Sequence, residues 1–201
     1  MDQQTITIYN QSATQIAALH DNLVPASIYR LVDRFFVRGA TCADVGCGIG
    51  RDSYWLSQQG YPVTGIDAAE GMLLEAQQRY SGLHFVHDSL PLLTTIEDGD
   101  FTNVLCSAVI MHLGADQLTL AIVHLLRIMI VGGVIVVSFR GTNNANNREN
   151  GKLYTPISVN ELITAFSKYG ATMLHYERKY EAGRGLEWHN LVFRKLSHPA
   201  A

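Results

Sequence analysis

The chain has 201 residues, a net charge of −3 and 47% apolar residues, so its length suits one domain with a substantial core. Its charged fraction of 16% excludes a disordered tail, and the absence of a basic run disfavours a duplex nucleic acid as partner. Three cysteines (Cys42, Cys47 and Cys106) and a polar N-terminal segment predict a cytoplasmic protein with no signal peptide, no metal site and no membrane association.

From residue 39 onward, short apolar runs alternate with helical patterns, which predicts a doubly wound α/β sheet. Residues 1–38 precede this core and are predicted to form an N-terminal helical cap with helices at 12–20 and 26–37. The expected strands are 41–45, 61–66, 83–86, 101–107 and 133–139, and the expected helices between them are 51–59, about 67–80, and 115–130. We therefore expect residues 1–201 to form a single domain, with its core at 39–201.

The pattern changes after the fifth predicted strand. Residues 141–151 are polar and rich in turn formers, so they are predicted to be a loop. Ser158 and Glu161 fit a capping box that begins a helix, and Gly170 marks its end. Residues 171–179 and 187–195 then resemble two strands, which close the sheet.

The strongest chemical signal is a glycine-rich turn, D-V-G-C-G-I-G-R-D over residues 44–52, between the first strand and the next helix. Glycines let the backbone approach a ligand closely, and a helix N-terminus presents free N–H groups. As a dinucleotide fingerprint the turn fits badly, because Arg51 stands where a third small residue belongs. A tight turn with close helix packing is the structural alternative.

Acidic residues follow the predicted strands. Asp67 ends the second strand about 20 residues after the glycines, where a ribose-binding acid belongs. Asp88 follows the third strand, and Asp44 precedes the turn. Each alone is more often a helix cap or turn former. Because the carboxyl ends of parallel strands share one sheet edge, the three together with the glycine-rich turn predict a ligand site there.

With these motifs on one edge, the chain resembles the class I S-adenosylmethionine (SAM)-dependent methyltransferases. The segments that carry the resemblance are A-D-V-G-C-G-I-G-R-D, V-T-G-I-D, H-D-S-L-P, F-T-N-V-L-C-S-A-V-I-M-H-L and L-L-R-I-M-I-V-G-G-V-I-V-V-S. The resemblance implies a seven-stranded Rossmann-like methyltransferase fold, mostly parallel, with an antiparallel C-terminal hairpin. G-R-D-S-x-W-L is similar to the small stand-alone members, including the methyltransferase domain 11, 12 and 25 groups and the tellurite-resistance type.

The resemblance also implies SAM as cofactor, S-adenosylhomocysteine (SAH) as product and no metal. Asp67 is expected to bind both ribose hydroxyls and Asp88 the adenine amino group, with the glycines beside the methionyl part. The expected cofactor-binding residues are Asp44, Gly46, Cys47, Gly48, Gly50, Arg51, Asp67, Ala68, Met72, Asp88, Ser89, Leu90 and Ser107.

The acceptor side is less defined. His112, just past the fourth strand, is the candidate catalytic base; the alternatives are that it starts the next helix or packs beneath the cofactor. The candidate substrate-binding residues are Tyr9, His112, Arg140, Arg148, Tyr154 and Trp188. Ordinary loop or edge-strand packing is the alternative for the last four.

The predicted function is transfer of the SAM methyl group, by in-line displacement, to a small-molecule acceptor by a monomer or homodimer. The fourth motif lacks the D/N-P-P-Y/F of enzymes that methylate adenine or glutamine, which disfavours DNA and protein amides. Three alternatives stay open: a non-catalytic SAM-binding sensor or accessory protein, a nicotinamide-dependent oxidoreductase, and an RNA methyltransferase.

Overall fold

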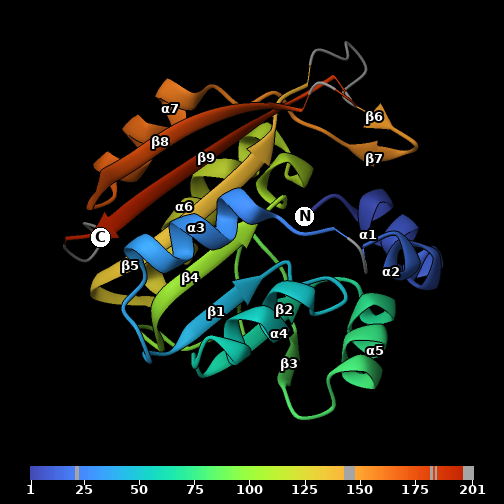
Figure 1. The fold of residues 1–201 in the computed structure, drawn as a ribbon. Helices are drawn as coiled ribbons and strands as arrows, with labels where there is room; N and C mark the ends of the chain where they lie inside the picture. The colour runs from blue at the N-terminus through green and yellow to red at the C-terminus, as the bar shows by residue number, and fades with distance from the viewer. Residues whose placement is uncertain (21–22, 143–147, 182, 184, 197–201) are drawn as a thin grey trace.

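The structure is a computed structural model that describes residues 1–201 except 21–22, 143–147, 182, 184 and 197–201 (Figure 1). Its helices are α1 (Gln3–Gln11), α2 (Ala13–His20), α3 (Ala26–Phe35), α4 (Arg51–Gln58), α5 (Glu70–Arg79), α6 (Leu118–Arg127) and α7 (Val159–Lys168), with short 3₁₀ turns η1 (Ile110–His112) and η2 (Ala115–Gln117). Its strands are β1 (Cys42–Val45), β2 (Val63–Asp67), β3 (His84–His87), β4 (Phe101–Ser107), β5 (Met129–Arg140), β6 (Arg148–Glu149), β7 (Lys152–Leu153), β8 (Ala171–Glu181) and β9 (Leu186–Lys195).

Seven of these strands form one sheet in the order β3-β2-β1-β4-β5-β9-β8. Strands β1 to β5 pair in parallel, whereas β9 runs antiparallel to both β5 and β8. This arrangement confirms the predicted fold, including the antiparallel C-terminal hairpin. Strands β6 and β7 pair separately as a small two-stranded sheet.

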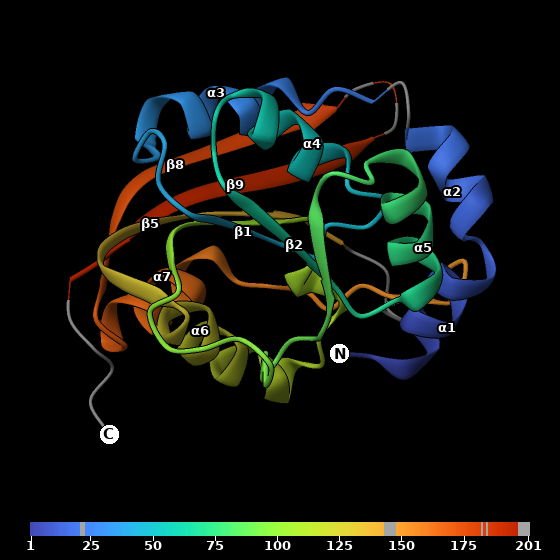
Figure 2. The same cartoon turned by 90° about the horizontal axis from the view of Figure 1, so that it is seen from below.

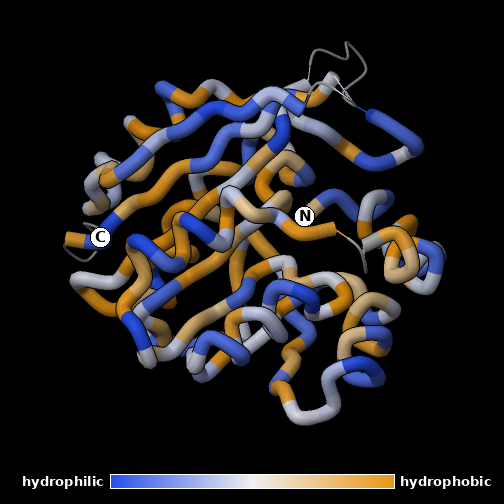
Figure 3. The backbone as a smooth tube through the Cα atoms, viewed as in Figure 1, coloured by the Kyte–Doolittle hydropathy of each residue, from blue (hydrophilic) through white to orange (hydrophobic). Residues whose placement is uncertain are grey.

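Helices cover both faces of the sheet, with α3 and α4 on one face and α6 and α7 on the other (Figures 1 and 2). Side chains alternate between the two faces along β5: Val134 and Val136 pack with α3, while Ile135 and Val137 pack with α6 and α7. The central strands are accordingly apolar along their length, and the outer strand β8 is mostly polar (Figure 3).

The first helices divide between two places. Helices α1 and α2 lie at the carboxyl edge of the parallel strands, where Ala13, Ile16 and Ala17 pack against Met72 of α5. Helix α3 instead packs flat on the sheet through its buried apolar stripe. Of the predicted cap of residues 1–38, α1 and α2 therefore reach the ligand edge, and α3 belongs to the layered core.

Some predicted element boundaries were wrong. Helix α1 was not predicted, because its T-I-T-I alternation is typical of a strand; Asp2 stabilises it by accepting a hydrogen bond from the Thr5 N–H at 2.8 Å. The predicted helix 115–130 ends at Arg127, and β5 begins at Met129. A continuous apolar run does not separate a buried helix from a buried strand.

Among the described residues, no helix has the length and apolarity needed to cross a membrane.

Candidate functional site

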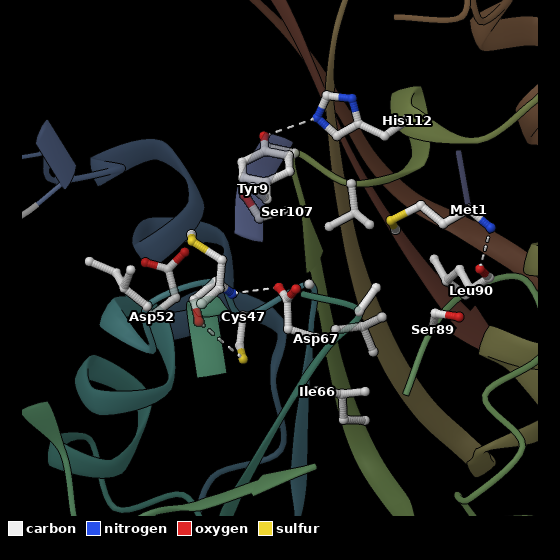
Figure 4. A pocket seen from close by; sticks show the side chains of 18 of the residues that line it. Met1, Tyr9, Cys47, Asp52, Ile66, Asp67, Ser89, Leu90, Ser107 and His112 are labelled. Atoms are coloured by element: carbon white, nitrogen blue, oxygen red, sulfur yellow. Dashed lines mark hydrogen bonds between the residues drawn. The ribbon is translucent and has the colours of Figure 1, made fainter. Parts of the chain in front are cut away.

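A cavity opens at the carboxyl ends of the parallel strands, beneath α1 (Figure 4). It lies between the glycine-rich turn after β1 and the segment that follows β4. Its lining residues are Met1, Tyr9, Val45, Gly46, Cys47, Gly48, Ile49, Arg51, Asp52, Ile66, Asp67, Ala68, Met72, Asp88, Ser89, Leu90, Ser107, Ala108, Val109 and His112. The cavity is therefore at the sheet edge that the sequence predicted.

The glycine-rich turn has little room for side chains. Gly46 and Gly48 have φ values of +76° and +56°, a backbone region that disfavours other residues. A Cβ on Gly46 would lie 2.2 Å from Cγ2 of Val109, across the turn. The carbonyl of Ile66 accepts hydrogen bonds from the N–H groups of Gly46 and Cys47, at 2.7 and 3.0 Å. The turn is thus fixed against β2.

Asp67, at the end of β2, bridges this turn and the start of α5. Its Oδ2 accepts a hydrogen bond from the Gly48 N–H and its Oδ1 one from the Ala69 N–H, both at 2.8 Å. Burial raises the pKa of Asp67, and these two backbone donors act in the opposite direction. The helix predicted from about residue 67 begins later than expected, because the N-cap of α5 is Ala69. An ionised carboxylate keeps lone pairs for further donors, such as ribose hydroxyls.

Asp88 organises the loop after β3. Its Oδ1 accepts a hydrogen bond from the Ser89 N–H at 2.7 Å, and its Oδ2 accepts two from Thr95, at 2.7 and 2.6 Å. Although partial burial acts to raise the pKa of Asp88, these hydrogen bonds hold it below its usual value. The carboxylate therefore stays ionised at the cavity rim.

A second acidic pair stands behind the glycine-rich turn. Asp44 is buried outside the cavity lining and accepts a hydrogen bond from the Ser53 hydroxyl at 2.6 Å. Burial, followed by the charge of Asp52, raises the pKa of Asp44 to about 7. Asp52 lines the cavity and accepts from Arg51 at 2.9 Å and from the Tyr29 hydroxyl at 2.8 Å. Because Arg51 also lines the cavity, the charge of Asp52 is matched within the protein at this end.

At the opposite end, Tyr9 and His112 meet (Figure 4). The carbonyl of Leu153 lies 2.5 Å from Nδ1 of His112, and a carbonyl only accepts, so Nδ1 carries the proton. Nε2 is then an acceptor and lies 3.3 Å from the Tyr9 hydroxyl, which donates to it. Burial lowers the pKa of His112 to about 4, with a further contribution from Lys152 and Arg140. The imidazole is therefore neutral at pH 7, with a lone pair toward Tyr9.

The cavity brings together most of the predicted residues. All predicted cofactor residues except Asp44 and Gly50 line it, as do Tyr9 and His112 from the predicted acceptor set. The other four acceptor candidates do not line it. The guanidinium of Arg140 lies 3.9 Å from the ring centroid of Tyr154, whereas Arg148 pairs with Asp2 at 2.8 Å and Trp188 donates to Glu181 at 3.3 Å.

Sequence reasoning missed several lining residues: Met1, Val45, Ile49, Asp52, Ile66, Ala108 and Val109. Ala108 and Val109 directly follow β4, so their position at the strand end was a usable signal. Met1 had no such signal, because its contact is long-range: its ammonium donates to the Leu90 carbonyl at 2.8 Å.

The residues present fit SAM. The carboxylate of Asp67 lines the cavity, and its oxygens suit the hydroxyl donors of a ribose. The glycine-rich turn leaves backbone exposed beside the cavity. Within the described part of the chain, no cluster of three His, Cys, Asp or Glu side chains has metal-binding geometry.

Together the sheet order and this edge cavity define the class I SAM-dependent methyltransferase fold. Residues 43–137 match the family model described as "Methyltransferase domain". This range is therefore similar to a methyltransferase domain, which favours the SAM-dependent interpretation over the nicotinamide-dependent one.

Three relatives illustrate the similarity. A magnesium-protoporphyrin O-methyltransferase from Synechocystis sp. is 30% identical over 110 residues, which are 53% of this chain and 47% of that protein. The chain thus matches about half the length of this curated relative.

A Burkholderia thailandensis 1,6-didemethyltoxoflavin N1-methyltransferase, solved with 1,6-didemethyltoxoflavin and SAH, has a TM-score of 0.74 at 19% identity, covering 95% of this chain and 85% of that one. A TehB-like SAM-dependent methyltransferase from Corynebacterium glutamicum has a TM-score of 0.69 at 22% identity, covering 94% and 97%. Both structures share the fold.

Proposed function

We propose that this protein transfers the methyl group of SAM to a small-molecule acceptor. The proposal rests on one cavity with two unlike ends: the glycine-rich turn with Asp67 for the cofactor, and the Tyr9–His112 pair facing it. The named acceptors of the relatives, protoporphyrin and didemethyltoxoflavin, are small molecules, which supports this acceptor class.

When bound, SAM supplies a methyl group on a sulfonium, which a nucleophile takes by in-line displacement. The residues of this chain align the two reactants and exclude water, with Tyr9 and His112 closing the acceptor end under α1. The carboxylate of Asp67 would hold the ribose, and the backbone of Gly46 and Gly48 would hold the methionyl part.

His112 accepts a proton from the acceptor. Its Nδ1–H is held by the Leu153 carbonyl, so Nε2 is the basic atom, and it receives the proton through the Tyr9 hydroxyl. Tyr9 passes its own proton to Nε2 as it takes the proton of the acceptor. A base of low pKa works best on an acidic O–H or N–H, so the acceptor is expected to carry such a group.

The remaining expectations complete the proposal. The protein acts as a monomer or homodimer, without nucleic acid or membrane partners. Its three cysteines are free and buried, in keeping with the cytoplasmic location predicted from the sequence.

Calorimetry with SAM and SAH tests the cofactor site, using wild type, Asp67→Ala and the control Glu97→Ala, which removes an exposed carboxylate outside the cavity. We expect micromolar binding by wild type and the control, and at least tenfold weaker binding by Asp67→Ala, about 1.4 kcal/mol. No binding by folded wild type would refute the proposal.

A second measurement separates an enzyme from a SAM-binding sensor. SAH formation is followed with a panel of small phenols, carboxylates and heterocyclic amines. Turnover that falls at least tenfold in His112→Ala, with unchanged SAH affinity, supports the base assignment. Full activity of His112→Ala would contradict it.

A further inference from the structure

An ion pair between Arg51 and Asp52 lies at the start of α4, directly after the glycine-rich turn. The Nε and Nη2 nitrogens of Arg51 donate to Oδ1 and Oδ2 of Asp52, at 2.9 and 3.0 Å. This two-point contact fixes the plane of the guanidinium. Both residues line the cavity. The pair is therefore an ordered part of the wall at the proposed cofactor end.

The guanidinium of Arg51 keeps donors after this pairing, because a guanidinium donates from each of its nitrogens. Its Nη1 has no hydrogen-bond partner in the described part of the chain. The buried side-chain nitrogens that lack a partner there are Nε of Arg140 and Nε2 of His175. Nη1 of Arg51 is thus not buried, and 26% of the side chain is exposed. A ligand atom can therefore reach this edge of the guanidinium.

Arg51 is the one cationic side chain among the described residues that line the cavity. His112, the other basic side chain there, is neutral at pH 7 because burial lowers its pKa to about 4. The carboxyl groups of the lining belong to Asp52, Asp67 and Asp88. Carboxylates repel an anionic group, and a cation attracts it. An anionic group of a ligand in this cavity therefore has its complement in Arg51.

Tyr29 on α3 holds the ion pair from outside the cavity lining. Its hydroxyl donates to Oδ1 of Asp52 at 2.8 Å. Its ring is stacked on Trp55 of α4, with 3.8 Å between the ring centroids and 1° between the planes. Since α3 packs flat on the sheet, this contact anchors Asp52 to the layered core. Through Asp52, the orientation of Arg51 is fixed as well.

The hydroxyl of Tyr29 has a role that packing alone does not explain. The stack with Trp55 joins α3 to α4 through the rings and does not involve the hydroxyl. Burial and then the charge of Asp52 raise the pKa of Tyr29, so its hydroxyl stays a donor at neutral pH. The hydrogen bond acts on a carboxylate of the cavity wall, and its direct effect is therefore on the site.

We propose that Tyr29 and Asp52 are positioning residues that hold the guanidinium of Arg51 to bind the α-carboxylate of the methionyl part of SAM. This inference rests on the proposed function and assigns one of its cofactor contacts. The carboxylate would accept from Nη1, while Asp52 keeps the opposite edge of the guanidinium. The glycines expected beside the methionyl part end at Gly50, so Arg51 is the first side chain after them.

The test compares SAH with S-adenosyl-3-thiopropylamine, which lacks only the carboxylate, in calorimetric titrations of the protein. We expect wild type to bind SAH at least tenfold more tightly than the amine. Arg51→Gln should reduce this preference to less than twofold, and Tyr29→Phe to between twofold and fivefold. The affinity of both variants for S-adenosyl-3-thiopropylamine should stay within twofold of wild type, which separates carboxylate binding from general damage to the site.

Tyr54→Phe is the matched control. Tyr54 is also on α4, and its ring is stacked on that of Tyr80 with 4.6 Å between centroids, but it does not line the cavity. This variant should show the wild-type preference. Arg51→Lys keeps the positive charge without the planar fork, so it should retain part of the preference. It also replaces Arg51→Gln should that variant fail to fold.

Equal affinity of wild type for the two probes overturns the inference. A preference that is unchanged in the Arg51 variants also overturns it. A preference that falls in Arg51→Gln but stays at the wild-type value in Tyr29→Phe overturns the positioning role of Tyr29. Failure of both probes to bind folded wild type is a separate result and counts against the proposed function.

Discussion

The two ends of the cavity are built in different ways. The proposed cofactor end comes from three consecutive strand ends, with Asp67 held by backbone N–H groups two and nineteen residues away. The acceptor end joins Tyr9 to His112 across 103 residues and His112 to Leu153 across 41. The first depends on short loops of a rigid sheet, and the second on the docking of α1 and the β6–β7 pair.

This contrast teaches where substitutions should be tolerated. The glycine-rich turn at the cofactor end has no room for an added side chain, since it packs against Val109 and β2. The acceptor end is held by side-chain hydrogen bonds to surface elements, each of which contributes about 1 kcal/mol. Changes at the first end should therefore affect folding and cofactor together, and changes at the second mainly the acceptor.

The largest expected effect is that of Gly46→Ala. The added Cβ would lie 2.2 Å from Val109, at a φ of +76°. Left-handed backbone costs roughly 1–2 kcal/mol for a residue with a Cβ, and overpacking roughly 1–3 more. We expect urea unfolding to show a loss of about 2–5 kcal/mol, together with loss of SAH binding.

Gly39→Ala is the matched control for this substitution. Gly39 has a φ of +70°, and a Cβ there would meet no atom within 4 Å. It isolates the backbone cost, so its loss of stability should be about 1–2 kcal/mol, with SAH binding retained. Equal losses in the two variants would show that the contact with Val109 is unimportant.

The next effect is a pH dependence carried by Asp44. Its pKa in the folded protein is about 7, above its ordinary value of 3.8. Because the raised pKa favours the protonated carboxyl, this contribution to stability is complete below pH 4 and is lost as the pH rises through 7. The slope is at most about 1.4 kcal/mol per pH unit.

Asp44→Asn removes the titrating group and should therefore remove that slope. As the pH rises from 5 to 8, wild type should lose stability relative to the variant. Urea unfolding at several pH values measures it, with Asp33→Asn, an exposed carboxylate, as control. Parallel pH profiles of wild type and Asp44→Asn would contradict the assignment.

The smallest effect is expected at the acceptor end. Thr5 is fully buried; its Oγ1 accepts from the Leu153 N–H at 2.9 Å and donates to Asp2 at 2.7 Å. Thr5→Val should cost about 1–2 kcal/mol in urea unfolding, because the Leu153 N–H loses its partner. Thr5→Ser keeps both hydrogen bonds and serves as control.

SAH affinity should stay within twofold in both Thr5 variants, because neither touches the cofactor end. A tenfold loss in Thr5→Val alone would mean that the two ends are coupled, and the contrast between them would fail.

The same contrast explains what the sequence could predict. Asp67, Asp88 and the glycines follow strands whose order was visible as alternating patterns, so the sequence could place them together at the sheet edge, where Asp67, Asp88, Gly46 and Gly48 line the cavity. Their binding of the cofactor stays a prediction. Tyr9 and His112 were named individually, but nothing in their spacing pairs them. Asp52 ends the quoted motif, but it lies inside α4, so its place in the sequence did not indicate that it lines the cavity.

Other elements were hidden for local reasons. Helix α1 contains the alternating segment T-I-T-I, which is typical of a strand. It is helical because Asp2 caps its N-terminus and because it packs against α5 and β7. The β6 and β7 strands have two residues each, too short for any periodic signal, yet they bring Lys152 over Tyr9. Tertiary contacts determine the secondary structure of these segments, which local propensity does not predict.

The attachment of α1 to β7 has a consequence for how such a protein changes over evolutionary time. Thr5 contacts the Leu153 backbone, so the covering of the acceptor is made of two peripheral pieces that depend on each other. Neither piece supplies a strand to the main sheet. If both segments were replaced together, the acceptor specificity of the protein could change. The main sheet and the proposed cofactor end would stay as they are.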